Sequence, residues 1–442
     1  MNIAFSNLIT TYPTWEVLKP YLLSSEGGSL RIVPYTGTTG PYALIRYVKG
    51  QSDLSRPHVA ALRSVVWNIE TNRPVGLIPV KSVTGDSFPR TGDMSLTGYK
   101  LEEFIDGTAI LMWYNPHATK WEICTRSTPG AIHGFYSRDL SFAQMFAEAS
   151  QGLDTSTLDT ASSYTFVLQH PRNRIVLPVE RPAIRCVQRV QIQPDNTLVY
   201  AEIPSILHPP RPYIFTSVAA LLSVVYNPTN RTQGIVIKSS DTRWKHRTAF
   251  YNRAHRLRGN KSDLNEVYLT LWKDKTLEEY LATFREERRD AKNTLERFKQ
   301  LTRQVYAVYN DAFKAKTLPR TAIPVSLRCF VYGLHNLYIQ QLRPAQRTVD
   351  WQTAQEFMNN FEDTSRIIYA FHEAMQGARN RIGMASVPTE LPAVVGTEVI
   401  VTDAPEPVRV EEEGTGLETA ETAVTAVTAE TAETAETSVP VA

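Results

Sequence analysis

Asp106 and Gly107 form an Asp-Gly pair between two apolar runs, in the stretch KLEEFIDGTAILMWY of residues 100–114. A lysine two residues before such an aspartate could act as a covalent nucleophile, provided that its amine is deprotonated and held in line with its target. The residue at that position is Phe104, and a phenyl ring has no amine with which to attack. The stretch therefore has the setting of a nucleophilic site without the nucleophile.

Lys100 is the candidate that could supply the missing amine. It lies six residues before Asp106 and shares the strand parity of position 104, so both side chains are expected on one face. Four residues of strand nevertheless separate the two positions by about 13 Å, which is more than a lysine side chain spans. Lys81, in PVKS, could instead reach in from a neighbouring strand.

Polar and basic side chains follow at further places along the chain. Arg126, in TRST, could contact a phosphate through its planar guanidinium or pair with a carboxylate at a strand surface. Gln169 and Gln233 have amides that donate and accept hydrogen bonds but carry no negative charge. Positive charge follows in QGIVIK and RWKHRTAFYN, at Lys238, Lys245 and Arg247.

The stretch RWKHRTAFYNRAHRLRGNK, residues 243–261, combines basic side chains with three aromatic rings. Contacts to backbone phosphates and stacked bases require that combination. We therefore predict RNA contacts at Arg243, Lys245, Arg247, Arg253, Arg256 and Arg258. The helix expected over residues 284–304 is also basic, but its interleaved acidic residues favour a salt-bridged solvated face over RNA contact.

The elements that must position these residues are mostly short strands. Residues 61–82 and 107–127 each contain two β-rich runs around a polar turn, and residues 163–178 and 232–240 supply further strands. Residues 140–151 have a helical pattern. Antiparallel hairpins with an added helix indicate an α+β domain over residues 1–270.

From Thr276 onward the apolar period becomes helical. Thr276 and Glu279 could form a capping box, apolar residues recur at helical spacing to about residue 316, and further helices are expected over 325–341 and 350–376. We predict an all-helical domain of residues 271–386 and a tail of residues 387–442. The tail consists largely of Thr, Ala, Glu, Val and Pro, and is expected to be disordered.

The net charge of +2 conceals an asymmetry between the body and the tail. From Val387 onward twelve acidic residues stand against one arginine, which gives −11 and leaves +13 for residues 1–386. A body of that charge attracts polyanions, so RNA or another polyanion is the expected partner, although a well-solvated surface would have the same composition. The acidic tail could shield the body from nucleic acid or serve solubility alone.

Several other classes of protein are disfavoured. No apolar run approaches the roughly 20 residues that span a membrane, and the first residues lack the features of a signal peptide. Cys124, Cys186 and Cys329 have no metal-ligand spacing, and their odd number suits a reducing compartment. Phosphate loops of the Walker or Rossmann kind and the HExxH motif are absent from the sequence.

Taken in order, these segments resemble the nucleotidyltransferase domain shared by ATP-dependent RNA ligases and mRNA capping enzymes. The resemblance covers about residues 60–270, and SYTFVLQHPRNRIV, GIVIK and LRGN are its most specific parts. More narrowly, the chain resembles RNA-ligase-like proteins of large cytoplasmic DNA viruses. The resemblance implies an antiparallel-sheet, ATP-grasp-like ligase domain, followed here by the helical domain and the acidic tail.

The resemblance also assigns a role to each candidate residue. It implies a covalent lysine at Phe104, nucleotide contacts at Asp106, Gly107 and Arg126, and carboxylates at Gln169 and Gln233. Lys238 would meet a phosphate, and Lys245 and Arg247 would be the paired phosphate-binding residues, unless a different register places Ala249 in the second position. The implied cofactor is ATP or GTP with Mg²⁺.

The departures from this pattern share one direction. The nucleophile is missing, and two carboxylates have become amides, which lowers the affinity for Mg²⁺, a hard cation that prefers anionic oxygen ligands. We expect a degenerate ligase-like protein that binds nucleotide or RNA in the host cytoplasm, at a viral replication site, or in the virion. The alternatives are an active RNA ligase or guanylyltransferase with a relocated lysine, and a structural protein of a virion or replication site.

Overall fold

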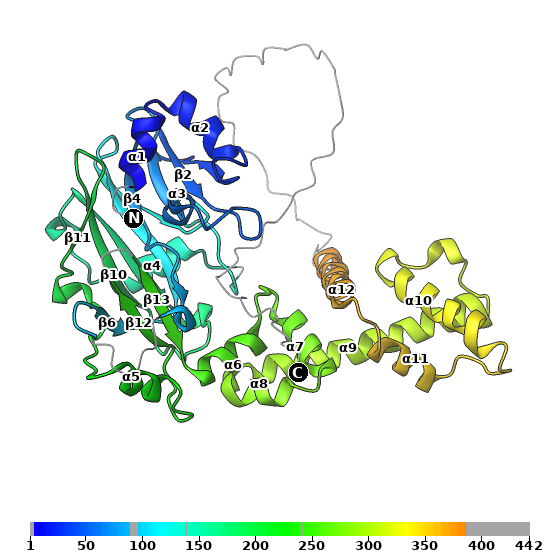
Figure 1. Ribbon diagram of the computed structural model, residues 1–442. Coiled ribbons are helices and arrows are strands. Elements are labelled where there is room, and N and C mark those ends of the chain that lie inside the picture. The colour runs from blue at the N-terminus through cyan, green and yellow to red at the C-terminus, as the bar shows by residue number, and fades with distance from the viewer. Residues whose placement is uncertain (1–3, 89–95, 138, 240–241, 386–442) are drawn as a thin grey trace, which may run out of the picture. The chain divides into compact units, whose positions relative to one another are not determined.

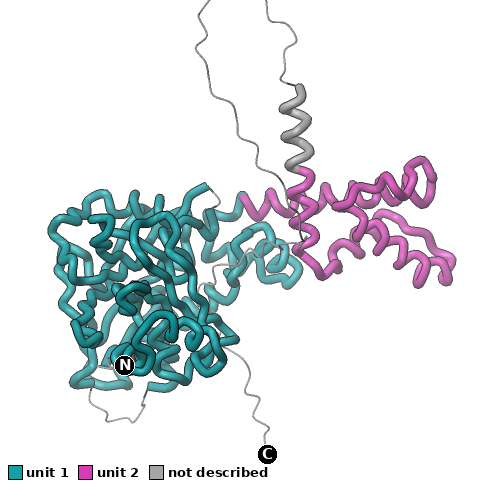
Figure 2. The backbone as a smooth tube through the Cα atoms, turned by 90° about the horizontal axis from the view of Figure 1, so that it is seen from above, with its two compact units in different colours: residues 1–289, 427–442 teal, residues 290–426 magenta. Residues whose placement is uncertain are grey.

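The computed structural model describes residues 4–88, 96–137, 139–239 and 242–385, with residues 375–385 as helical backbone alone (Figure 1). Among these residues it has two compact units, which meet in sequence between Arg289 and Asp290 (Figure 2). The expected boundary at residue 270 remains a prediction about independent folding. The predicted tail of residues 387–442 lies outside the described residues.

The first unit is an α+β body built on three sheets (Figure 1). The first sheet is antiparallel, in the order β1 (Arg31–Pro34), β2 (Tyr42–Arg46), β3 (Val65–Asn68), β4 (Arg73–Leu77). The second is antiparallel, in the order β11 (Leu198–Ala201), β10 (Ala183–Ile192), β9 (Ser162–Gln169), β7 (Thr108–Asn115), β8 (Lys120–Thr125). The hairpins predicted over 61–82 and 107–127 are confirmed as β3–β4 and β7–β8.

The third sheet, called the small sheet below, carries most of the candidate site. Its order is β5 (Val83–Thr84), β13 (Arg243–Arg247), β12 (Gly234–Lys238), β6 (Lys100–Glu103). The β5–β13 pairing is parallel, and the other two pairings are antiparallel.

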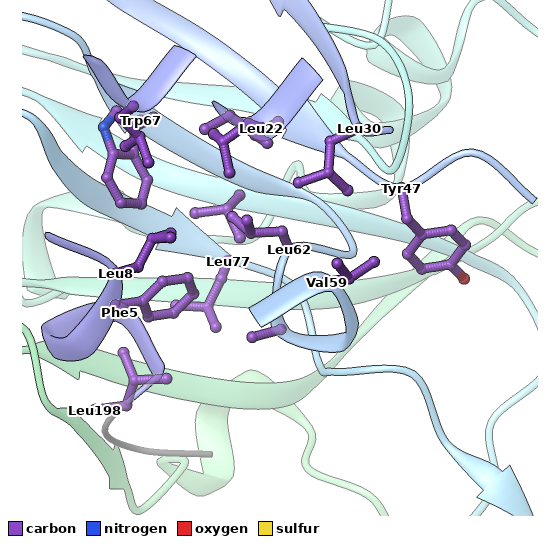
Figure 3. Packing of buried hydrophobic residues seen from close by; sticks show 14 of the residues in the cluster. Phe5, Leu8, Leu22, Leu30, Tyr47, Val59, Leu62, Trp67, Leu77 and Leu198 are labelled. Carbon is purple, nitrogen blue, oxygen red and sulfur yellow. The ribbon is translucent and has the colours of Figure 1, made fainter. Parts of the chain in front are cut away.

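Three helices cover the first sheet: α1 (Ala4–Thr11), α2 (Trp15–Leu23) and α3 (Pro57–Ala61). Figure 3 shows Phe5 and Leu8 of α1 in the same apolar cluster as Leu22 and Trp67, all of them buried. The indole Nε1 of Trp67 donates to the Asn72 side chain at 3.1 Å, so this buried polar atom is satisfied. These N-terminal helices were not predicted from the sequence.

The five-stranded sheet is covered on both faces. Helix α4 (Phe142–Ala149) packs on one face through Phe142 and Met145, and Ser141 and Gln144 form a capping box at its start. On the other face, Leu111 and Trp113 of β7 pack against apolar residues of the first sheet. The helix predicted over 140–151 is therefore confirmed.

One face of the small sheet is apolar and the other is charged. Leu101, Ile235 and Ile237 pack under helix α5 (Val218–Val225), in a cluster with Leu221. Because successive strand residues point to opposite faces, the residues between them project away from α5.

Three helices follow the small sheet and complete the first unit: α6 (Ala249–Arg258), α7 (Leu264–Lys273) and α8 (Leu277–Thr283). Helices α6 and α7 were not predicted from the sequence. The expected capping box is wrong, because Thr276 makes no side-chain cap and Glu279 instead pairs with Arg253.

The remaining helices are α9 (Arg288–Tyr309), α10 (Val325–Leu337), α11 (Trp351–Asn359) and α12 (Thr364–Ala385). Single π-helical segments, Asn310–Lys314 and Tyr338–Leu342, follow α9 and α10. The predicted helical region is confirmed, but its last segment consists of two helices, since α11 ends at Asn359. None of the described helices combines the length and apolarity needed to cross a bilayer.

Candidate functional site

The residues of the small sheet that point away from α5 form one charged face. Across its strands, Gly234 pairs with Arg247, Val236 pairs with Lys245 and Glu102, and Lys238 pairs with Arg243 and Lys100. Side chains of directly paired residues lie on the same face of a sheet. We call the following set the charged face: Lys100, Glu102, Phe104, Lys238, Arg243, Lys245 and Arg247. It carries five cations and one carboxylate.

Glu102 is buried between two lysines at one end of the charged face. Its side chain is 3% exposed and accepts from Lys238 Nζ at 2.5 Å and Lys100 Nζ at 2.7 Å. Burial would raise the pKa of Glu102, but the two ammonium groups outweigh burial and hold that pKa below its usual range. Burial also lowers the pKa of Lys238, an effect that Glu102 opposes and Arg243 reinforces.

Lys100 therefore lies on the face that strand parity predicts, as an ion-pair partner of Glu102. Its side chain is 67% exposed, and its Cα pairs with that of Lys238. Position 104 lies at the other end of the charged face, beyond Glu102, where the β6 segment leaves its last strand pair.

Phe104 lies beside a glycine of the neighbouring strand. Its backbone N–H donates to the Gly234 carbonyl at 3.0 Å, and Gly234 pairs in turn with Arg247. A Cβ on Gly234 would lie 1.9 Å from the His246 carbonyl oxygen, so this position requires glycine. The Phe104 ring centre lies 5.6 Å from the guanidinium carbon of Arg247 and 5.8 Å from that of Arg243.

Arg247 is a cation that no described carboxylate neutralises. Its guanidinium carbon also lies 5.4 Å from the Tyr251 ring centre, and its buried Nε has no hydrogen-bond partner among the described residues. Burial lowers the pKa of neighbouring His255 to about 4, with Arg247 and Lys245 adding to the shift. The positive charges of Arg247 and Lys245 therefore act on this part of the face and would favour an anion there.

Asp106 is committed to protein donors. It is buried, its Oδ2 accepts from the backbone N–H of Val176 and Leu177 at 2.9 and 2.8 Å, and its Oδ1 accepts from the Tyr251 hydroxyl at 2.6 Å. The Gln169 amide donates to the Asp106 carbonyl at 2.9 Å. These contacts fix the segment that precedes β7 against the one that follows β9.

Gly107 has a structural requirement of its own. Its φ is +154°, and an added Cβ would lie 2.4 Å from the Leu168 carbonyl oxygen. A larger residue would therefore force β7 away from β9, because these two strands are direct neighbours.

Gln233 precedes β12 and is buried, and its Oε1 has no hydrogen-bond partner among the described residues. Near Phe104, this amide, the lysine-paired Glu102 and the hydrogen-bonded Asp106 are oxygen donors, and none of them is a free carboxylate. These three residues therefore do not fit the metal that the resemblance implies. Glu202 is a further carboxylate, in the lining of a pocket beside Lys100 and Lys238. No group of three or more metal-ligating side chains gathers in the described part of the chain.

Arg126 lies beside an aromatic ring that follows strand β2 of the first sheet. It follows β8, and its guanidinium carbon lies 5.7 Å from the ring centre of Tyr47, beside the first sheet. Burial lowers the pKa of Arg46 to about 10, and the neighbouring Arg126 and Arg31 contribute to the shift. The structure therefore places Arg126 beside Tyr47 and close enough to Arg46 for the two charges to interact.

The predicted RNA contacts on α6 fall into two groups. Arg253 and Arg256 are exposed, and Arg253 pairs with Glu279. Arg258 is 2% exposed, pairs with Glu287, and stacks between Tyr136 and Phe284 at 4.3 and 4.5 Å. The prediction that Arg258 contacts RNA is therefore corrected, because its guanidinium is buried and already paired.

A pocket of about 540 Å³ opens between the charged face and strands β10 and β11. Its charged lining consists of Lys100, Arg189, Glu202, Lys238 and Arg243. Lys238 Nζ also donates to the Val187 carbonyl of β10 at 3.3 Å, which ties the two sheets together. Arg189 was not predicted from the sequence, where it is one basic residue within a strand and belongs to no motif. It pairs with Asp159 at 3.0 Å.

No family model matches this chain, and no curated protein matches it. Among solved structures 16 chains match. A protein described as an ATP-dependent DNA ligase from Aquifex aeolicus overlaps with a TM-score of 0.36 and 13% identity, over 66% of this chain and 80% of that one.

Two forms of an archaeal ATP-dependent RNA ligase overlap with a TM-score of 0.32 and 12% identity each. They cover 62% and 64% of this chain, and 74% and 76% of their own. TM-scores this low do not establish a shared fold. The function proposed below therefore rests on the motifs and contacts of this chain.

Proposed function

We propose that this protein is an RNA-ligase-like nucleotidyltransferase that has lost covalent chemistry and binds nucleotide or RNA through its charged face. The observation that carries the proposal is the row formed by Phe104, Gly234 and Arg247. The strand position where the motif requires a lysine amine presents an aromatic ring instead, and the phosphate-binding cation beside it is retained.

Phosphate binding is supported by the charge of the face. Arg247 has no carboxylate partner among the described residues, and its buried Nε has no hydrogen-bond partner there. Guanidinium groups bind phosphate with two parallel hydrogen bonds, so a ligand phosphate would satisfy the buried Nε–H of Arg247. At the other end of the face, the pocket of about 540 Å³ beside Lys100, Lys238 and Arg243 lies in the size range of small-ligand sites.

The first alternative is an active ligase or guanylyltransferase that uses Lys100 as its nucleophile. The favourable observation is that Lys100 shares the charged face and lines the pocket. Against it, the Lys100 amine pairs with Glu102 at 2.7 Å, and position 100 lies at the opposite end of the charged face from position 104.

The second alternative is a structural protein that keeps the fold as a scaffold. The sequence resembles proteins of large cytoplasmic DNA viruses. This resemblance supports a location in the host cytoplasm or the virion, both for a structural protein and for the proposed nucleotide- or RNA-binding protein. Detection of the protein in purified particles and in infected-cell fractions tests that placement. A scaffold without ligand would bind neither RNA nor nucleotide at moderate salt.

The proposed function is tested by measuring the affinity of the protein for single-stranded RNA and for ATP against salt concentration. Arg247→Ala and Lys245→Ala should each weaken RNA binding and reduce the salt slope by about 0.7, the value for one phosphate on a single strand. Lys19→Ala is the matched control, since Lys19 is an exposed lysine of α2, outside the charged face. Equal affinities for wild type and all three variants would overturn the proposal.

A further inference from the structure

We propose that Phe104 is a base-stacking residue, and that the ligand of the charged face is a single-stranded polynucleotide with an unstacked base. This inference rests on the proposed function, since it takes phosphate binding by the same face as given. It adds the class of ligand and gives the ring at position 104 a role of its own.

The ring lies where it can receive a base. Phe104 is partly exposed, and its backbone pairs with that of Gly234, which pairs in turn with Arg247. Gly234 contributes no side chain to the charged face. The aromatic ring and the arginine therefore lie in one row of the face, with only backbone between them.

The guanidinium groups of Arg247 and Arg243 do not cover the face of the Phe104 ring. A guanidinium carbon in van der Waals contact lies about 3.5–4.0 Å above a ring plane. The carbons of Arg247 and Arg243 lie 5.6 and 5.8 Å from the ring centre. Neither carbon is therefore in van der Waals contact with the middle of the ring, and neither cation covers it.

The chemistry of the row matches a nucleotide unit. A base stacks on an aromatic face whatever its identity, and the phosphate that follows it needs a cation within a few ångströms. Phe104 supplies the aromatic face, and Arg247 and Arg243 supply the cations. A duplex keeps its bases stacked on one another, and an inorganic polyphosphate has no base, so neither ligand can use the ring.

Binding should be measured with two probes, a ten-nucleotide single-stranded RNA and an inorganic polyphosphate chain. We expect Phe104→Leu, which keeps an apolar side chain, to weaken RNA binding by roughly 5- to 150-fold, the effect of losing one stacked base. Polyphosphate affinity should stay unchanged, and Phe104→Trp should retain RNA binding. Retained polyphosphate binding also shows that the charged face is folded in each variant.

Phe313→Leu is the matched control, because Phe313 is a partly exposed phenylalanine of the segment Asn310–Lys314 with the guanidinium carbon of Arg320 at 4.8 Å from its ring centre. It should leave both affinities unchanged. If Phe104→Leu leaves RNA affinity unchanged, or lowers both affinities equally, the stacking role is overturned and phosphate binding stands. If wild type binds neither probe, the proposed function itself fails.

Discussion

The ring centre of Phe104 lies 5.6 Å from the guanidinium carbon of Arg247, across the bare backbone of Gly234. This relationship joins the start of the β6–β7 connection to β13, although the two residues are far apart in sequence. It places an aromatic ring and an uncompensated cation where covalent nucleotidyl transfer would need an amine. The ring changes the chemistry available to the face from attack on phosphorus to stacking.

The ion pair between Arg258 and Glu287 should contribute strongly to the stability of the first unit. Arg258→Ala leaves Glu287 buried without its partner, which costs about 3–5 kcal/mol in the free energy of unfolding. Arg253→Ala, on the same helix, removes an exposed pair with Glu279 and should cost about 0.2–1 kcal/mol. Urea unfolding of both variants measures the difference, and equal losses would contradict the assigned burial.

Asp106 should contribute to the stability of the fold rather than contact the nucleotide directly. Asp106→Ala leaves two backbone N–H groups and the Tyr251 hydroxyl without their acceptor, at a cost of about 3 kcal/mol or more. Tyr251→Phe removes only the hydroxyl and should cost about 1 kcal/mol. The check is chemical unfolding together with ATP binding. A fully stable Asp106→Ala protein that has lost ATP affinity would show a direct nucleotide contact instead.

His255 should make stability depend on pH between its unfolded and folded pKa values. Burial and the cations Arg247 and Lys245 lower its pKa from 6.5 to about 4. The unfolded state therefore binds more protons in that window, and the free energy of unfolding falls as the pH drops from 6.5 to 4, by on the order of 3 kcal/mol. Below about pH 4 this group contributes no further change.

Unfolding of wild type and His255→Gln between pH 7 and 4.5 tests this dependence, and His208→Gln serves as the exposed control. The decline should be absent from His255→Gln and present in the control. Because a bound phosphate offsets Arg247 and Lys245, it should also raise the pKa of His255, as followed by NMR. A pKa of His255 near 6.5 that does not change when phosphate binds would contradict the burial and the neighbouring cations assigned to this residue.

Much of the first unit could be predicted because apolar and polar residues alternate along its strands. The apolar residues of β7 and β8 mark a hairpin, and parity correctly places Lys100 on the charged face with Lys238 and Arg243. Such patterns depend on the period of the chain alone. They also identify Phe104 as the residue at the position of the missing nucleophile.

The rest depends on partners distant in sequence. The burial of Arg258 is set by Glu287, which lies beyond two helices, and nothing within RAHRLRGNK distinguishes Arg258 from the exposed Arg256. Glu102 likewise receives Lys238 from a strand that follows more than a hundred residues later. Thr276 had the spacing of a capping box, but Arg253 competes for Glu279 through a stronger charged contact.

The central claim is that no lysine of this chain attacks a nucleotide phosphorus. The direct measurement is incubation of wild type and Lys100→Ala with α-labelled ATP or GTP and Mg²⁺, followed by denaturation and detection of labelled protein. The account predicts no covalent label on either protein, alongside reversible binding of the same nucleotides. A label on wild type that is lost from Lys100→Ala would contradict it, and would make Lys100 the relocated nucleophile.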